Sequence, residues 1–212
     1  MGRWKPDARG RLEQAALALY SERGFEQSTA AQIAERAGLT ERTFFRHYAD
    51  KREVLFGGAQ ALEEAFVETL VGIPDGAAPI DAMASTLERI AAHFLERHDF
   101  ARQRQAVIMA NAELRERELI KLASLSASLA ATLRRRGVRE PAASLTAEAG
   151  IAVFKIGFER WVGGSGERTL ADLLRESFDE LRIVAAGGCP PIGPTGPGVG
   201  PVADGRPSAR QV

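Results

Sequence analysis

The first 186 residues place apolar side chains at the spacing of one helix face, in one segment after another. Leu12, Ala15, Ala16 and Leu19 recur at i, i+3, i+4 and i+7, which predicts a first amphipathic helix. No segment alternates apolar and polar residues with the period of two that a half-buried strand requires. The pattern therefore predicts an all-α fold.

Two short helices joined by a sharp turn are predicted next. Thr29 can cap a helix through its hydroxyl, and Gln32 stands where it can complete a capping box. Gly38 follows this helix at a position that suits a left-handed backbone, which glycine adopts without strain. Thr40 then caps a second helix, from residue 41 to about residue 48. This arrangement predicts a helix-turn-helix.

The second of these helices has the form of a recognition helix. Phe44 and Tyr48 share its inner face, and a helix of this length spans about 13 Å, which fits the major groove of DNA. The rest of its surface carries hydrogen-bond donors: Arg42, Thr43, Arg46 and His47. On charge alone, a solvated surface helix in an ordinary bundle is an equal alternative, because arginine is common on exposed helix faces.

A longer series of helices is predicted after residue 48. Asp50 can cap a helix, Glu53 can complete its capping box, and the apolar pattern continues to about Val71. The segment 71–79, VGIPDGAAP, breaks the chain with glycine and proline. Five further helices follow, at residues 80–97, 99–110, 113–136, 141–162 and 169–186, so the total is about nine. Their boundaries rest on caps and stops at Asp99, Asn111, Gly137, Pro141, Gly163, Gly164 and Thr169.

The last two predicted helices have wide apolar faces. The apolar residues of the first are Leu145, Ala149, Ala152, Val153, Ile156 and Trp161. Those of the second are Leu170, Leu173, Leu174, Phe178, Leu181 and Val184. These faces either pair with another subunit or pack within the chain.

The composition is that of a globular protein, except for a C-terminal segment rich in glycine and proline. The chain has 212 residues, of which 45% are hydrophobic, enough to bury a core. Charge interrupts every apolar stretch before it reaches the length of a membrane span, and residues 1–6 are too polar for a signal peptide, so we expect a cytoplasmic protein with no membrane partner. Residues 187–212 hold seven glycines and six prolines and are expected to be disordered. The single cysteine, Cys189, excludes an internal disulfide.

Positive charge is concentrated at the N-terminal end. The formal net charge of the whole chain is zero, but residues 1–52 hold ten lysines and arginines against seven acidic residues, which leaves +3. Residues 1–8 include Arg3 and Lys5 and form either a basic arm that follows DNA or a frayed terminus. The positive end thus coincides with the predicted helix-turn-helix.

The sequence contains no residue pattern typical of an enzyme or a metal site. There is no G-x-S-x-G motif, no phosphate-binding loop and no glycine-rich dinucleotide turn. His93 and His98 are five residues apart, so on one helix they point to different faces instead of sharing a metal ion. We therefore predict no catalytic residues, no metal and no cofactor.

The middle helices could enclose a small molecule, because clefts between bundle helices are common ligand sites and Met and Phe side chains adapt to apolar shapes. The candidate lining residues are Met83, Leu87, Phe94, Met109, Leu122, Phe154 and Phe158. The polar candidates are His93, Arg102, Arg104 and Asn111. For each apolar residue the alternative is an ordinary place in the core.

Residues 9–56 resemble the DNA-binding domain of the tetracycline-repressor (TetR) family. The resemblance rests on Gly24, Phe25, Thr29, Ile33, Ala34, Gly38, Thr43, Phe45, His47, Tyr48 and Lys51. It implies binding to double-stranded DNA, with Lys51 beside a phosphate. The residues that we expect to contact DNA are Thr29, Thr40, Arg42, Thr43, Phe45, Arg46, His47 and Lys51. Arg42 departs from the family pattern, which often has a small residue there, so its contact with a base is an expectation specific to this chain.

The resemblance also implies a mode of action. In the family the last two long helices pair with their copies to form a four-helix dimer interface, and a palindromic operator needs that symmetry. We expect a homodimeric repressor that a small apolar effector releases from its operator, with residues 1–52 for DNA and residues 53–186 for ligand binding and dimerisation. The alternatives are a helical DNA-binding protein with no ligand response and a helical interaction protein that binds no DNA.

Overall fold

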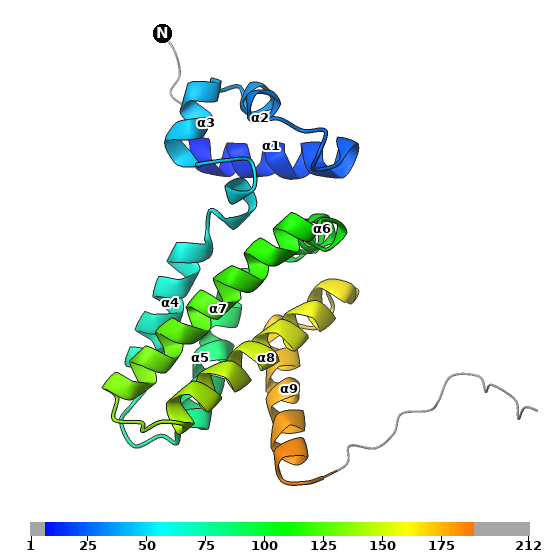
Figure 1. Cartoon of the computed structure of the whole chain (residues 1–212). Coiled ribbons are helices and arrows are strands. Elements are labelled where there is room, and N and C mark those ends of the chain that lie inside the picture. Colours follow the sequence, from blue (N-terminus) through cyan, green and yellow to red (C-terminus); the bar gives the residue numbers. More distant parts are fainter. Residues whose placement is uncertain (1–6, 189–212) are drawn as a thin grey trace, which may run out of the picture.

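The computed structural model describes residues 7–188, which form an assembly of helices (Figure 1). That range holds nine α-helices, two short 3-10 helices and no strand, so the all-α prediction is confirmed. In chain order the elements are α1 (Ala8–Arg23), α2 (Ala30–Arg36), α3 (Glu41–His47), η1 (Glu53–Phe56), α4 (Ala59–Val71), α5 (Pro79–Ala91), η2 (Ala92–Phe94), α6 (His98–Ala110), α7 (Ala112–Arg135), α8 (Ala142–Gly163) and α9 (Leu170–Ala185). Most of the predicted basic arm and the tail from Cys189 onward lie outside the described residues.

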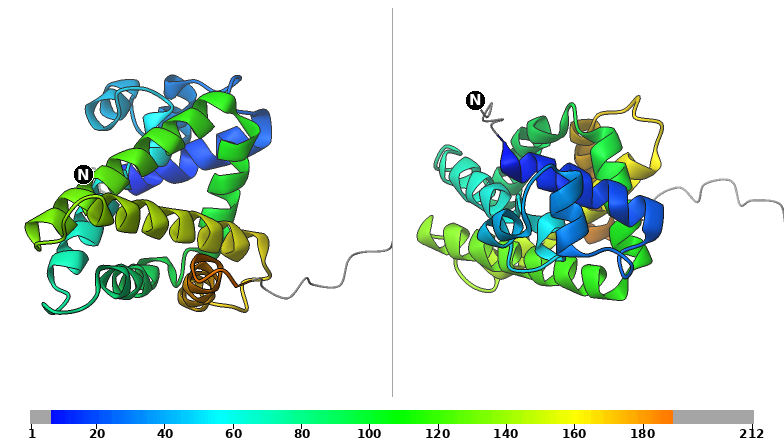
Figure 2. Two further views of the ribbon diagram at one scale, coloured as in Figure 1. Left: turned by 60° about the horizontal axis from the view of Figure 1, so that its bottom comes forward. Right: turned by 90° about the horizontal axis from the view of Figure 1, so that it is seen from above.

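One hydrophobic cluster holds the three N-terminal helices together. Leu12 of α1, Ile33 of α2 and Phe44 of α3 are completely buried in it. The cluster also takes in residues of η1, α6 and α7: Val54, Leu55, Phe56, Val107, Ile108 and Leu114. As a result α6 packs directly against α1 (Figure 2). We call α1, α2, α3 and η1 together the N-terminal unit.

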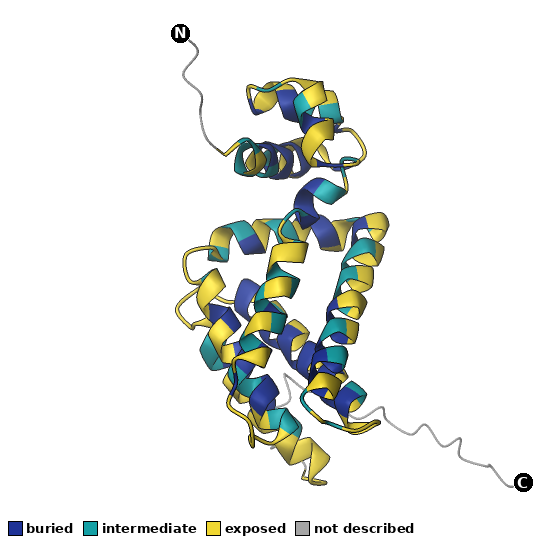
Figure 3. Cartoon of the chain, turned by 90° about the vertical axis from the view of Figure 1, so that its left-hand side faces the viewer, coloured by how far each residue is buried: buried dark blue, intermediate teal, exposed yellow. Residues whose placement is uncertain are grey.

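A second cluster holds α4, α5, α7, α8 and α9 together, each with a buried side turned inward and an exposed side outward (Figure 3). Phe66 of α4 is completely buried there. Two glycines bring α8 close to its neighbours. A Cβ at Gly150 would lie 2.6 Å from Met83 Cγ, and one at Gly157 would lie 2.7 Å from Leu174 Cδ2. No helix within residues 7–188 has both the length and the apolar character needed to cross a lipid bilayer.

The predicted continuous helix from Asp50 to Val71 is wrong. Asp50 does act as a cap, because its Oδ1 accepts hydrogen bonds from the amides of Arg52 and Glu53 at 2.8 and 3.1 Å. It caps only the turn before η1, and the predicted capping box does not form, because the Glu53 carboxylate pairs with Arg117 and Lys121 instead. Gly57 and Gly58 then interrupt the helix before α4. A Cβ at Gly57 would lie 2.8 Å from the hydroxyl of buried Tyr48, just beyond α3, so a larger residue there would require neighbouring side chains to shift.

Other helix boundaries differ by a few residues. α9 begins after Thr169, whose hydroxyl accepts a hydrogen bond from the amide of Asp172 at 3.2 Å, as the cap prediction requires. The predicted helix 80–97 ends at Ala91 and continues as the 3-10 turn η2. α6 begins at His98, so Asp99 lies in its first turn instead of capping it.

Candidate nucleic-acid interface and ligand cavity

The turn between α2 and α3 is built by local hydrogen bonds. The Thr29 hydroxyl accepts from the amide of Gln32 at 3.2 Å, and the Gln32 side chain accepts from the amide of Thr29 at 3.0 Å, which completes the predicted capping box. Gly38 has a φ of 65°, in the left-handed region that glycine adopts without a Cβ clash. The Thr40 hydroxyl accepts from the amide of Thr43 at 3.2 Å. These contacts confirm the helix-turn-helix.

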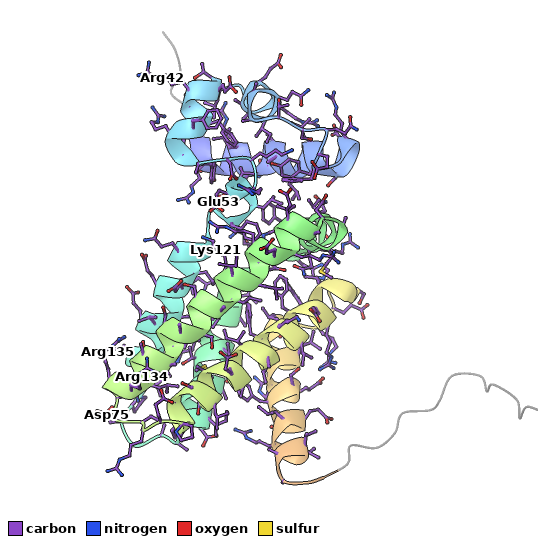
Figure 4. The ribbon with its side chains drawn as sticks, in the orientation of Figure 1. Arg42, Glu53, Asp75, Lys121, Arg134 and Arg135 are labelled. Atoms are coloured by element: carbon purple, nitrogen blue, oxygen red, sulfur yellow. The ribbon has the colours of Figure 1, made fainter. Side chains whose placement is uncertain are left out.

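Most of the surface of α3 faces solvent. Phe44 is completely buried, and Tyr48 just beyond the helix is 4% exposed, as their shared spacing predicts. Phe45 is 53% exposed, which is unusual for a phenylalanine with no partner to cover it. The polar residues of the outer face are Arg42, Thr43, Arg46 and His47, of which Thr43 is half-buried and the others are exposed. Arg42 extends from the end of the molecule that lies away from the C-terminal helices (Figure 4).

Lys51 has an intramolecular role that the sequence did not indicate. Its ammonium group donates to the main-chain oxygens of Phe25, Ser28 and Glu26 at 2.9, 3.2 and 3.4 Å and lies 4.2 Å from the centre of the Phe25 ring. An ammonium group has three N–H donors, so these contacts use all of them. Lys51 thus stabilises the loop between α1 and α2. A DNA phosphate that bound Lys51 would have to share its ammonium group with these main-chain oxygens.

Tyr20 of α1 binds the main chain of Lys51. The Tyr20 hydroxyl donates to the main-chain oxygen of Lys51 at 2.6 Å. Burial raises the pKa of Tyr20 well above its usual value, with the charge of Asp50 as the smaller cause. The hydroxyl therefore keeps its proton and remains a donor.

Ion pairs and hydrogen bonds connect η1 to the C-terminal helices. Glu53 accepts a hydrogen bond from Arg117 at 2.5 Å and lies 3.7 Å from the ammonium group of Lys121, both on α7 (Figure 4). Arg104 of α6 donates to the main-chain oxygen of Leu55 at 2.8 Å, and its guanidinium lies 5.0 Å from the centre of the Phe56 ring. The N-terminal unit is therefore held to both α6 and α7.

A cavity of about 910 Å³ lies beside these contacts between η1 and the C-terminal helices. Its walls come from η1, α4, η2, α6, α7 and α8. Five of the seven apolar candidates line it: Phe94, Met109, Leu122, Phe154 and Phe158. The other two do not, because Met83 packs on Gly150 where α5 crosses α8, and Leu87 is completely buried in the same core. The apolar wall is strongly aromatic: the Phe158 ring lies 5.8 Å from Phe94 and 5.9 Å from Phe154.

The polar residues of the cavity differ in part from those predicted. His93 and Arg104 line it. Arg102 instead faces solvent beside Asp99, at 3.5 Å, and the Asn111 side chain donates to the main-chain oxygen of Val107 at 2.7 Å. Several polar lining residues were not predicted from the sequence, including Arg97, Gln105, Glu118, Lys121 and Lys155. A spacing of four between Gln105 and the predicted lining residue Met109 was the signal available for Gln105.

Arg104 is a largely buried charge of this wall. Its Nη1 lies 3.1 Å from Glu118 Oε1, and about a fifth of each side chain is exposed. Burial lowers the pKa of Arg104, and the neighbouring Glu118 opposes that shift. The pair therefore places two compensating charges at the end of the cavity nearest η1.

The apolar residues predicted on α8 and α9 are partly buried and partly exposed, with Ala149 and Leu181 intermediate. Six of the residues predicted to face a partner are buried within the chain: Val153, Trp161, Leu170, Leu173, Leu174 and Phe178. Others are exposed: Leu145, Ala152 and Ile156 on α8, and Val184 on α9. Leu145 and Ile156 are 65% and 52% exposed, so an apolar stripe runs along the outer side of α8.

Within residues 7–188, no group of three or more histidine, cysteine, aspartate or glutamate residues is arranged to hold a metal ion.

Known protein families match both the N-terminal and the C-terminal part of the chain. Residues 13–56 match the family model for bacterial regulatory proteins of the tetR family. Residues 77–186, which are more than half of the chain, match the model for the MftR C-terminal domain. The HTH-type transcriptional regulator TcmR of Streptomyces glaucescens is 39% identical over 82 residues, which cover 39% of this chain and 36% of that protein. The chain thus spans about a third of the length of this curated relative.

Solved structures share the whole fold. The TetR-family repressor FadR of Thermus thermophilus, in complex with lauroyl-CoA, is 24% identical with a TM-score of 0.53 and covers 90% of this chain and 100% of its own. FadR of Bacillus subtilis, in complex with stearoyl-CoA, is 19% identical with a TM-score of 0.57 and covers 81% and 96%. At these identities the likeness shows the fold alone. With the family matches, it establishes that the chain belongs to the TetR family of DNA-binding transcriptional regulators.

Proposed function

We propose that this chain is a homodimeric repressor that leaves a palindromic operator when a small, largely apolar molecule occupies the cavity. The observation that carries the proposal is the position of Arg104, which lines the cavity and also bonds to Leu55 beside the helix-turn-helix. One side chain therefore touches both the ligand space and the DNA-binding unit.

On the DNA side, the exposed donors of α3 support base recognition. Arg42 is near the N-terminus of this helix, the end that usually meets base edges, and a guanidinium can span guanine O6 and N7. Arg46 and His47 stand one turn further along. We propose that Thr29 and Thr40 supply contacts at the two helix starts, since both side chains are exposed.

The exposed stripe of α8 supports a homodimer. An apolar stripe that includes Leu145 and Ile156 is unfavourable in water, and pairing with a second copy would cover it. Two recognition helices must stand about 34–36 Å apart to reach successive major grooves, so a rigid pairing of C-terminal helices would set that distance.

On the ligand side, the aromatic wall and the volume of the cavity support an organic molecule of drug-like size. The FadR proteins from Thermus thermophilus and Bacillus subtilis were solved with lauroyl-CoA and stearoyl-CoA, which makes acyl groups one class to include in a screen. Release would be a population shift, because a ligand that prefers the DNA-incompatible state by about 1–3 kcal/mol weakens operator binding by the same coupling energy.

The test begins with selection of an operator from a randomised DNA pool by the full chain. Fluorescence anisotropy then measures its affinity, and light scattering measures the mass of the complex. We expect a two-fold symmetric site bound by a dimer, with a dissociation constant on the order of 10 nM at physiological salt. The absence of any sequence preference would contradict the DNA-binding half of the proposal, and an operator complex insensitive to every ligand that stabilises the protein would contradict the sensing half.

A further inference from the structure

The cavity wall contains a buried hydrogen-bond acceptor that has no donor. Gln105 of α6 lines the cavity, and within residues 7–188 its Oε1 is the one buried side-chain nitrogen or oxygen without a hydrogen-bond partner. Leaving a polar atom buried and unpaired is costly, and such atoms are rare in folded proteins. This oxygen therefore calls for a partner that the chain does not supply.

The orientation of the Gln105 amide follows from its neighbour. Its Nε2 donates to Glu118 Oε2 at 3.4 Å. Turning the amide over would instead place its oxygen against a carboxylate oxygen, and two acceptors repel each other. The oxygen is consequently the unpaired atom, and because it is buried, the amide must rotate about its one long bond to Glu118 to meet an incoming donor.

Arg104 supplies the complementary group on the preceding residue. Its Nε bonds to Leu55 and its Nη1 to Glu118, which fixes the plane of the guanidinium. Its Nη2 makes no hydrogen bond to any residue between 7 and 188, so its two N–H groups are unused on a side chain that lines the cavity. A donor on Arg104 and an acceptor on Gln105 thus stand at the same end of the cavity, and both side chains hold Glu118.

The remainder of the wall accepts an apolar body. Phe94, Phe154 and Phe158 form a cluster of ring faces and edges, which suits aromatic groups in stacked or edge-on contact. The polar end and the aromatic wall belong to one cavity.

We infer that the effector is a neutral aromatic molecule with a hydroxyl group, which donates its proton to Gln105 Oε1 and accepts a hydrogen bond from Arg104. A hydroxyl is both donor and acceptor, so it satisfies both residues at once. A carboxylate cannot donate to Gln105, and it would enter beside the Glu118 carboxylate that already balances Arg104. This inference rests on the proposed ligand-binding role of the cavity.

The test uses three biphenyl probes that differ in one group: 4-phenylphenol, 4-methoxybiphenyl and biphenyl-4-carboxylate. Isothermal titration calorimetry on the full chain gives their affinities. We expect 4-phenylphenol to bind about tenfold more tightly than the methyl ether, because the ether leaves Gln105 unpaired. In Gln105→Met, which keeps the length of the side chain but removes the amide, that preference should disappear.

Gln103→Met is the matched control, since Gln103 lies on the same helix but is exposed to solvent and does not line the cavity. It should keep the full preference. Equal wild-type affinities for the phenol and the ether, a preference that survives in Gln105→Met, tightest binding of the carboxylate, or no binding of any probe would each overturn the inference. The wild-type comparison decides the matter even if Gln105→Met does not fold.

Operator binding by the same protein preparations separates this inference from the proposed function. A protein that binds its operator but shows no preference for the hydroxyl overturns the inference alone. A protein that prefers the hydroxyl but recognises no operator overturns the proposed DNA-binding role and leaves the ligand assignment standing.

Discussion

Arg104 Nε donates a hydrogen bond of 2.8 Å to the main-chain oxygen of Leu55, which makes Arg104 a direct link between the cavity wall and η1. The link is reinforced at Phe56, whose ring faces the guanidinium. Because η1 follows α3 in the chain and packs in the N-terminal cluster, a displacement of Arg104 would be felt by the helix-turn-helix. Arg104 therefore connects the cavity wall directly to the N-terminal cluster that also holds the helix-turn-helix together.

Arg104→Met should lower the free energy of unfolding by about 2 kcal/mol, because it removes charged hydrogen bonds to Leu55 and Glu118 and leaves Glu118 without its main partner. Urea denaturation measures this. Arg102→Met is the control, since Arg102 is exposed on the same helix and its loss should change stability by no more than about 0.5 kcal/mol. Equal effects of the two substitutions would show that the Arg104 contacts do not stabilise the fold.

Lys51→Met should destabilise the N-terminal unit by about 1–2 kcal/mol, because three main-chain oxygens each lose the hydrogen bond from its ammonium group. Hydrogen exchange should quicken at the amide of Ser28, which bonds to Phe25 in the loop between α1 and α2. Arg52→Met, which removes an exposed neighbour, should leave this loop unchanged.

The same variant tests the phosphate contact that the family resemblance implies for Lys51. If each subunit loses one phosphate contact, the slope of log K against log[salt] should flatten by about 1.8 for a dimer. A less stable protein with an unaltered salt slope would assign Lys51 a structural role only.

The helix-turn-helix could be predicted because its determinants are local. Thr29 and Gln32 are three residues apart, and the capping box that they form needs no other part of the chain. The close approach of Gly57 to Tyr48 and Glu13, just after η1, instead involves residues that only the folded chain brings together. The apolar pattern across this region favoured a continuous helix because periodicity does not register such contacts.

The cavity could be predicted only in part for the same reason. Periodicity identifies Met83 and Phe158 alike as apolar helix positions, but the crossing of α5 and α8 at Gly150 decides that Met83 is core. Gln105 and Glu118 lie on different helices, and their hydrogen bond follows from how α6 packs on α7. Spacing within a single helix carries no information about that packing.

Ile156→Asp should convert the proposed homodimer to a monomer, because it places a charge in the exposed apolar stripe of α8, where pairing would bury it. Light scattering at tens of micromolar measures the change. Leu119→Asp is the control, since Leu119 is similarly exposed, at 58%, but lies on α7. Phe178→Asp is unsuitable for this test: Phe178 is 2% exposed, so the substitution would unfold the chain whatever its oligomeric state. A wild-type monomer, or a dimer indifferent to Ile156→Asp, would refute this interface.

Gly57→Ala should cost about 1–3 kcal/mol of stability, because its Cβ would lie 2.8 Å from the Tyr48 hydroxyl and from Glu13 Oε1. Gly58→Ala provides the comparison: no atom lies within 4 Å of a Cβ there, and its φ of −86° suits alanine. That substitution should be neutral or should stabilise by up to about 1 kcal/mol through the unfolded state. Thermal melts of both variants decide, and similar melting temperatures would mean that the approach to Tyr48 relaxes at little cost.

Arg42→Ala should weaken binding to the selected operator by about 1–3 kcal/mol per half-site and relax the preference at one base position, because a guanidinium at the start of α3 is placed to read guanine. Arg36→Ala is a matched control, since Arg36 is exposed on α2 but forms an ion pair with Glu22. It should leave sequence preference unchanged. A repeated binding-site selection with each variant measures the effect. If the Arg42→Ala protein selects the wild-type operator with every position equally constrained, Arg42 contacts no base, and the departure from the family pattern at this position has another cause.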